Sequence, residues 1–180
     1  ARTSGAKKAK PSRGAKGARV RLEVDARRAQ LVEMGLEMFA VQSYDALSIE
    51  EVAERAGISK GLLYHYFPTK RDFYKASVEE AARRLLALLE LPPTLPPAER
   101  LMVGLERYLS FVERHAAAYA TLLRGGIGTD PALAAVIEST RLACLARLME
   151  GLGDHARDPM VRTLTRGWIG LVESTSLDWL

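Results

Sequence analysis

Apolar residues recur along this chain at spacings of three and four residues, which is the period of one face of a helix. Leu31, Met34 and Met38 follow this spacing in the first such segment, and no useful stretch alternates apolar and polar residues as a half-buried strand would. The pattern predicts an all-α protein. We expect helices at about residues 20–40, 48–56, 60–67, 70–90, 98–115, 117–123, 131–151 and 159 to the end.

The ends of the two short helices are marked by residues with known capping chemistry. Ser48 is placed to cap the first of them, and Glu51, three residues on, would complete a capping box. Gly57 ends that helix, because a tight turn favours a residue that can adopt positive φ. Ser59 caps the next helix and Pro68 closes it. These signals predict two short helices joined by a tight turn.

A proline-rich connector divides the chain into two helical parts. The segment 91–97 has the sequence LPPTLPP and is expected to be free of helix. We predict a disordered basic arm at 1–19, a first helical domain at 20–68, a connecting helix at 69–91 and a second helical domain at 98–180. Leu180 lies within a helical pattern and no cap or breaker follows it, so we expect the natural chain to continue.

The composition is that of a soluble globular protein, with 48% hydrophobic and 27% charged residues. No apolar run approaches the roughly 20 residues of a membrane span, and the N-terminus lacks the apolar stretch of a secretory signal. Cys144 is the only cysteine, which excludes an intrachain disulfide and makes a cysteine-based zinc site improbable. We expect a cytoplasmic protein that neither contacts a membrane nor holds a metal or cofactor.

Positive charge is concentrated at the N-terminus. The chain as a whole carries +4, whereas residues 1–28 hold ten basic and two acidic residues. A segment of this kind has almost no apolar residue to bury and does not fold alone. The phosphate backbone of DNA is its natural partner. The alternative is a solvated tail without a role.

A helix-turn-helix motif is predicted between Ile49 and Phe67. Two short helices that cross need a small residue at the crossing, a glycine in the turn and an apolar residue that packs back, and Ala53, Gly57 and Leu63 satisfy these needs. With Phe67 they form the expected core of the motif. The residues left to point outward are Ser59, Lys60, Gly61, Leu62, Tyr64 and Tyr66. A helix of this size fits the major groove of DNA.

This segment resembles the DNA-binding signature of the tetracycline-repressor (TetR) family. The matching residues are Ser48-Ile49, Val52-Ala53, Ala56 to Gly61, Leu63 to Phe67 and Lys70, within a likeness that spans roughly residues 27–75. The resemblance implies an N-terminal three-helix DNA-binding domain and a C-terminal helical domain for ligand binding and dimerisation. It also implies base reading by Lys60, Gly61, Leu62, Tyr64 and Tyr66, and phosphate contacts by Ser48, Ser59, Tyr64 and Lys70.

Each of these residues also has a purely structural interpretation. Tyr64, His65 and Tyr66 could be half-buried packing residues, and for His65 we favour that interpretation. Lys60 and Lys70 could be ordinary solvated lysines, although their positions in the motif favour DNA contacts. Leu62 departs from the family, in which this position is often polar, and offers only apolar contact, for instance to a thymine methyl group.

The last helix is our candidate for self-association. Its apolar face is wider than packing on one side requires, and glycines along it would let another backbone come close. The predicted interface residues are Val161, Leu164, Gly167, Trp168 and Leu171. They would form half of a four-helix bundle in a homodimer. The alternative is a helix buried in the core of one subunit.

The resemblance also implies a small-molecule effector pocket between about residues 98 and 170. Its candidate lining residues are Met102, Leu105, Tyr108, Phe111, His115, Tyr119, Leu122, Arg124, Cys144, Leu148 and Trp168. Most such residues would be ordinary core in any helical protein. Their apolar bias hints at a lipophilic ligand.

Other classes of function are less well supported by the sequence. The three histidines are widely spaced, and no HExxH, GxSxG, P-loop or paired-cysteine motif is present, so we do not expect an enzyme. A nonspecific or architectural DNA binder driven by the basic arm, or an activator without a small-molecule effector, is compatible with the same residues. The main prediction is a repressor released from a near-palindromic operator by a small ligand.

Overall fold

The computed structural model describes residues 13–124 and 130–180, and side chains from Val24 onward. The first twelve residues of the predicted arm and most of the glycine-rich segment 125–131 lie outside this part of the chain. The described residues form only helices and connecting turns, which confirms the all-α prediction. The helices are α1 (Arg13–Val41), α2 (Ile49–Arg55), α3 (Lys60–Tyr66), α4 (Lys70–Leu88), α5 (Pro97–Arg114), α6 (Ala116–Arg124), α7 (Pro131–Gly151) and α8 (Pro159–Trp179), with a 3-10 turn, η2 (Gly153–Arg157), before α8.

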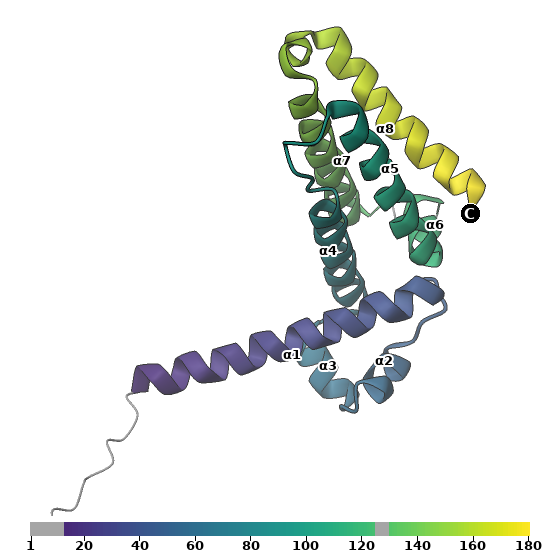
Figure 1. Cartoon of the computed structure of the whole chain (residues 1–180). Coiled ribbons are helices and arrows are strands. Elements are labelled where there is room, and N and C mark those ends of the chain that lie inside the picture. The colour runs from purple at the N-terminus through teal and green to yellow at the C-terminus, as the bar shows by residue number, and fades with distance from the viewer. Residues whose placement is uncertain (1–12, 125–129) are drawn as a thin grey trace, which may run out of the picture.

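The molecule has two layers joined by α4 (Figure 1). Helix α1 crosses the base of α4, and α2 and α3 lie beneath α1. Above them, α5, α6, α7 and α8 form a bundle around the upper part of α4 (Figure 1). Helix α4 therefore packs in both layers and is the helix that joins them.

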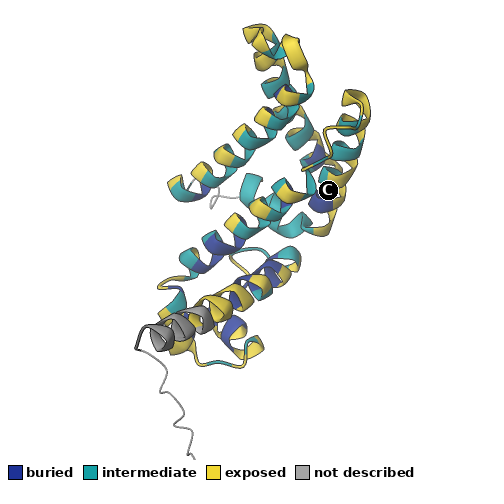
Figure 2. Ribbon diagram, turned by 60° about the vertical axis from the view of Figure 1, so that its left-hand side comes forward, coloured by how far each residue is buried: buried dark blue, intermediate teal, exposed yellow. Residues whose placement is uncertain are grey.

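The lower layer has the denser core. Val52, Leu63 and Phe73 are fully buried there, and buried residues concentrate where α1, α3 and α4 meet (Figure 2). Aromatic rings fill much of this core: the centroids of Phe39 and Tyr74 lie 4.7 Å apart, edge to face. In the upper bundle few side chains are fully buried (Figure 2), a pattern typical of a domain that encloses space.

The boundaries differ from the sequence prediction at two places. Helix α1 begins at Arg13, so part of the arm that we predicted to be disordered is helical. Alanine, arginine and lysine favour helix, and extending an existing helix costs far less than nucleating one. Pro97, which we placed in the connector, is the first residue of α5, where its missing N–H costs nothing.

The capping box predicted at Ser48 is only half formed. The Ser48 hydroxyl oxygen accepts the backbone N–H of Glu51 at 3.1 Å, but the Glu51 carboxylate accepts a hydrogen bond from the side chain of Gln42 instead of returning to Ser48. A complete capping box, which the sequence analysis missed, begins α4 between Thr69 and Asp72. This box fixes the start of α4 directly after the end of α3.

Candidate nucleic-acid interface and effector cavity

The helix-turn-helix core has the packing that its sequence predicts. Ala53, Leu63 and Phe67 are all buried, and Leu63 is completely inaccessible. Gly57 adopts φ 63° in the turn, a conformation that L side chains rarely adopt. The N–H of Ile58 donates to the carbonyl of Ala53 at 3.0 Å and closes the turn. The orientation of α3 is therefore fixed by α2 and by the core.

The opposite face of α3 is exposed. Lys60 and Gly61 are open to solvent, and Leu62 and Tyr64 are 41% and 37% exposed. Tyr66 differs, since it is half-buried and packs against the core of the lower layer. Of the five predicted base readers, four are thus presented outward, whereas Tyr66 combines packing with partial exposure.

His65 does not pack in the way we favoured. Its side chain is exposed, and its ring meets the Tyr66 ring edge to face with centroids 5.7 Å apart. The sequence order explains the difference: Leu63 and Phe67 occupy the buried face, so the two positions between them that project outward are 64 and 65.

An acidic side chain pairs with the cation of the reading helix. Lys60 forms an ion pair with Glu50 of α2, and its Nζ lies 5.8 Å from the centre of the Tyr64 ring. The hydrogen bond from Lys60 lowers the pKa of Glu50 and raises that of Lys60, so the pair is fully ionised near neutral pH. Glu50 was not predicted from the sequence, because it lies in the first turn of α2, ten residues before Lys60, and only the crossing of α2 and α3 brings the two side chains together.

The predicted phosphate contacts surround this face. The hydroxyl oxygens of Ser48 and Ser59 accept backbone N–H groups at 3.1 Å, which leaves each hydroxyl proton free to donate to an anion. Lys70 begins α4, and its Nζ lies 4.5 Å from the centre of the Tyr44 ring. The starts of α2, α3 and α4 therefore each carry a polar or charged group that could bind a phosphate.

Two ion pairs attach α4 to its neighbours. Arg84 binds Glu33 of α1, and Arg71, at the start of α4, binds Asp130. Asp130 is also the N-cap of α7, where its carboxylate accepts the N–H of Ala132 at 2.9 Å. A single carboxylate thus joins the helix that follows the reader to a helix of the upper bundle.

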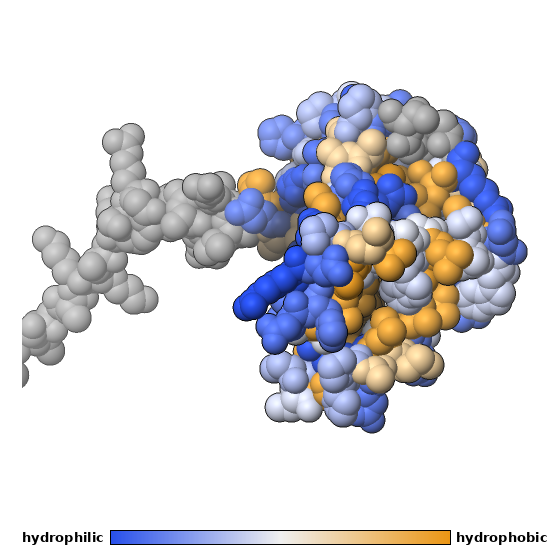
Figure 3. Space-filling model, turned by 90° about the horizontal axis from the view of Figure 1, so that it is seen from above, coloured by the Kyte–Doolittle hydropathy of each residue, from blue (hydrophilic) through white to orange (hydrophobic). Residues whose placement is uncertain are grey.

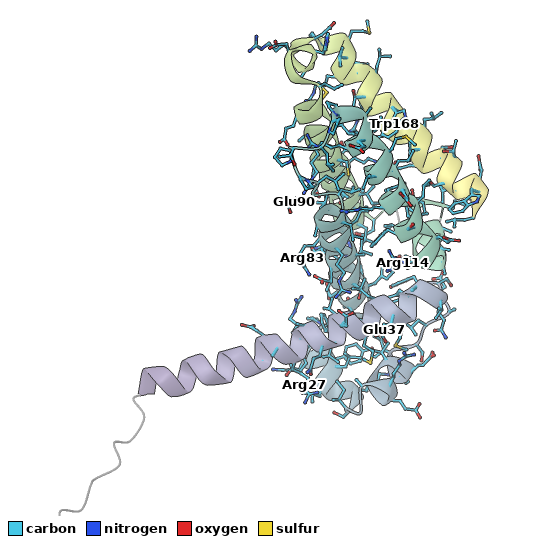
Figure 4. All side chains as sticks on the ribbon, in the orientation of Figure 1. Arg27, Glu37, Arg83, Glu90, Arg114 and Trp168 are labelled. Atoms are coloured by element: carbon cyan, nitrogen blue, oxygen red, sulfur yellow. The ribbon has the colours of Figure 1, made fainter. Side chains whose placement is uncertain are left out.

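The upper bundle contains a cavity of about 680 Å³ between α5, α7 and α8. Its volume falls within the range of small-molecule binding sites. The predicted residues Leu105, Tyr108, Cys144, Leu148 and Trp168 line it. Burial raises the pKa of the Cys144 thiol, so the side chain there is an uncharged, weakly polar group. Trp168 lies on α8 (Figure 4).

A second cavity of about 120 Å³ lies deeper, between the two layers. Its lining includes Tyr108, Phe111, His115, Tyr119 and Leu122, all of which the sequence analysis placed at a pocket. The lining also reaches the lower layer through residues of α1 and α4, namely Leu36, Phe39, Tyr74 and Ser77. The two cavities have Leu85, Tyr108, Thr140 and Glu173 in common.

Two predicted pocket residues line neither cavity. Met102 is 65% exposed. Its neighbours on α5, Leu101 and Gly104, line the larger cavity, but Met102 lies on another face of the helix. Arg124 is also exposed, and its guanidinium donates to the carbonyl of Leu177. The sequence analysis missed Arg100, Arg141 and Arg147, which line the larger cavity. Arg141 and Arg147 occur at helical spacing from Cys144 and Leu148, a signal that could have identified them.

The predicted association face of α8 is divided by the fold. Leu164 and Leu171 are 65% and 60% exposed, and Gly167 between them is open. Trp168 is half-buried and lines the cavity, as Leu164 also does, and Val161 is half-buried as well. Apolar side chains also gather on the molecule's upper face, between polar margins (Figure 3). The outward apolar stripe of α8 is therefore narrower than we expected and does not include the tryptophan.

Comparison with known proteins identifies the family. Residues 31–77 match the model of bacterial regulatory proteins of the tetR family, and residues 97–180 match that of the tetracyclin repressor-like C-terminal domain. The chain belongs to the TetR family. Its members are transcription regulators that bind DNA, function as dimers and are not enzymes.

Individual relatives agree with this assignment. The transcriptional activator FasR of Mycolicibacterium smegmatis is 30% identical over 168 residues, covering 89% of this chain and 75% of its own. The repressor KstR of Rhodococcus jostii is 26% identical over 112 residues, which cover 62% of this chain and 53% of KstR. A TetR-family regulator from Streptomyces coelicolor has 35% identity and a TM-score of 0.81, with 86% of this chain and 70% of that chain covered.

Within residues 13–124 and 130–180, no helix is long and apolar enough to span a membrane. The same residues contain no cluster of three or more histidine, cysteine or acidic side chains suited to a metal ion.

Proposed function

We propose that this TetR-family protein is a homodimeric repressor that a lipophilic ligand releases from a near-palindromic operator. The observation that carries the proposal is the connection made by α4. This helix begins at Lys70, after a turn of three residues that follows the reading helix α3, and residues further along it line the cavities. Two reading helices spaced about one turn of DNA apart would enter successive major grooves. Because its target is chromosomal DNA, we place the protein in the cytoplasm.

Ligand and operator are coupled in this proposal through the position of α4. A ligand in the cavity alters operator affinity only if it binds the DNA-competent arrangement and the released arrangement with different affinities. The outward stripe of α8, with Leu164, Gly167 and Leu171, supplies the surface for the second subunit. A change in the tilt of α4 in each subunit would then change the distance between the two readers.

Selection of bound sequences from random duplex DNA at near-physiological salt tests the DNA part. We expect enrichment of an inverted repeat. Affinity that collapses with salt, without preference among sequences, would instead indicate a nonspecific binder driven by the basic arm.

Variants of Tyr64 test the reading face. Tyr64→Ala is expected to weaken binding to the selected operator about tenfold or more, while binding to unrelated DNA changes far less. Tyr64→Phe retains the ring and removes only the hydroxyl group, so a phosphate contact made by that group would be lost equally on both DNAs. Equal losses on both DNAs for Tyr64→Ala would remove Tyr64 from the base readers.

Gly104 offers a matched pair of variants for the cavity. A Cβ built on this residue meets only Leu91, at an ordinary 3.8 Å, and both residues line the cavity. Gly104→Leu should therefore fill part of the cavity, and Gly104→Ala should leave it largely open. A lipophilic compound that lowers operator affinity in the wild type and in Gly104→Ala should lose its effect in Gly104→Leu. Unchanged operator affinity in the presence of a bound compound would refute the coupling.

An activator is the second candidate, because the relative FasR is named a transcriptional activator. The two functions differ in the sign of their effect on a promoter. Transcription from a promoter carrying the selected operator, measured with and without the protein, decides between them: repression predicts less transcript and activation predicts more.

A further inference from the structure

The larger cavity combines an apolar wall with an excess of positive charge. Most of its lining is leucine, proline, alanine and other apolar groups, and its charged residues are Arg100, Arg141, Arg147 and Glu173. Arg141 is neutralised by Glu173 of α8, with guanidinium to carboxylate distances of 2.7 to 3.0 Å. The cavity therefore retains the charges of Arg100 and Arg147.

These two arginines come from different helices, α5 and α7, and line the same end of the cavity. The Nη1 atom of Arg100 lies 4.0 Å from the point where a Cβ on Gly151 would stand, and Gly151 is one helical turn after Arg147. Both side chains are half-buried, and neither has an ion pair or a side-chain hydrogen bond with another described residue. Half-buried charges without partners are costly unless something pairs with them.

The helix ends next to the cavity offset only part of the positive charge of Arg100 and Arg147. The C-terminal carbonyls of α7 lie nearby and favour cations. The first turn of α5, however, also borders the cavity at Pro97 and Ala98, and its N-cap makes no side-chain hydrogen bond, so this helix end adds positive potential. An anion placed between Arg100 and Arg147 would complete the site.

The opposite end of the cavity offers a ligand no uncompensated charge. There Glu173 pairs with Arg141, and the Tyr108 hydroxyl shares a hydrogen bond with that of Tyr119. Burial raises the pKa of both tyrosine hydroxyls, that of Tyr119 to about 12. The residues that line both cavities are Leu85, Tyr108, Thr140 and Glu173. A chain that begins at the arginines can therefore follow the apolar wall of the larger cavity as far as Tyr108.

We propose that the ligand of this cavity is a single-chain amphiphile with an anionic head, whose head binds Arg100 and Arg147 and whose chain points toward Tyr108. The proposal rests on the proposed function, since it names the class of ligand for the same cavity. Carboxylate and phosphate heads share the chemistry that an arginine pair recognises.

The test is titration calorimetry with three series of straight-chain compounds of 8 to 16 carbons, kept below their micelle concentrations: alkanoic acids, alkyl phosphates and primary alcohols. We expect the anionic series to bind about tenfold to hundredfold tighter than alcohols of equal length, because each charged hydrogen bond contributes strongly in a half-buried site. Each added methylene should tighten binding about fourfold until the cavity is full. Comparison of acid with phosphate identifies the preferred head.

The arginines are tested with Arg100→Gln and Arg147→Gln, each of which keeps a long polar side chain and removes the charge. We expect each variant to lose most of the preference for anions and to bind alcohols as the wild type does, which also shows that it is folded. The matched control is Arg114→Gln, near the far end of α5 (Figure 4), where the guanidinium contacts only the carbonyl of Ser110. Its anion preference should be unchanged.

Three outcomes would overturn the assignment: alcohols binding as tightly as acids, preference persisting in both arginine variants, or no binding in any series. Operator affinity measured with the same compounds separates this inference from the proposed function. If alcohols bind and release the operator as well as acids do, the head group is wrong and the proposed function stands. If acids bind through the arginines and leave operator affinity unchanged, the ligand class stands and the proposed function fails.

Discussion

Gly35 is the position where the structure most clearly opposes the expectation from helix propensity. It lies inside α1, where replacement of glycine by alanine ordinarily stabilises a helix by about 1 kcal/mol. A Cβ at this position would stand 2.6 Å from Cζ of Phe73 and closer still to Oγ of Ser77, both on α4. The close crossing of α1 and α4 therefore depends on the absence of a side chain.

We expect Gly35→Ala to destabilise the protein. Overpacking costs about 1 to 3 kcal/mol, and contacts as short as these place the cost in the upper part of that range. After the gain in propensity, a net loss of about 1 to 2 kcal/mol remains, which should lower Tm by about 2 to 8 °C in a chain of this size. Gly104→Ala is the control, because its Cβ meets nothing closer than 3.8 Å and should raise Tm slightly. Thermal and urea unfolding followed by circular dichroism measure both changes.

A double variant checks the cause. Ser77→Ala removes the nearest atom, so Gly35→Ala should cost less in the Ser77→Ala background than in the wild type. The Phe73 ring remains, and the rescue should be partial. A Tm for Gly35→Ala equal to or above that of the wild type, or a cost that is the same in both backgrounds, would refute the reasoning.

Two further predictions concern charges. Glu50→Gln removes the ion-pair partner of Lys60 and should tighten operator binding about twofold to fivefold. Glu54→Gln makes the same charge change on α2 at a residue without a described ion-pair partner, and should have a smaller effect. Equal gains for the two variants in fluorescence anisotropy titrations would show that only net charge matters. Hydrogen bonds, first from Arg83 and then from Arg84, lower the pKa of Glu80 to about 2, so this carboxylate stabilises the fold above about pH 4.5 and loses its contribution as the pH falls from 4.5 toward 2. Glu80→Gln should therefore reduce stability by about 1 to 3 kcal/mol at pH 7 and flatten the acid limb of a plot of urea midpoint against pH, and an unchanged acid limb would contradict this.

Sequence reasoning located the elements that short-range chemistry determines. Ser59 and Gly57 delimit a helix and a turn through bonds within a few residues, so their pattern is readable without the fold. The failures arose where a distant residue decides. The Glu51 carboxylate accepts a hydrogen bond from the distant Gln42 and not from the backbone N–H of the N-cap. Whether His65 or Tyr66 is half-buried depends on which face of α3 packs against the core of the lower layer.

The same distinction applies to the cavity. Helical spacing correctly grouped apolar residues such as Leu105 and Cys144, since residues on one helical face share an environment. It could not show that Trp168 faces the cavity and that Leu171 faces outward, because both belong to the apolar part of one amphipathic helix. The crossing of α8 over α5 and α7 makes that choice, and no local pattern encodes it.

The arrangement of cavities, core and ion pairs together explains why α4 is the element that a ligand could move. Its lower half is held to α1 by the crossing at Gly35 and by the pair of Arg84 with Glu33. Its first turn is held to α7 by Arg71 and Asp130, and α7 forms one wall of both cavities. Under the proposed function, a ligand chain that enters the deeper cavity would separate α4 from the upper bundle while the contacts with α1 persist. Because close-packed cores move as units, the reading helix would tilt together with α4 and would not deform alone.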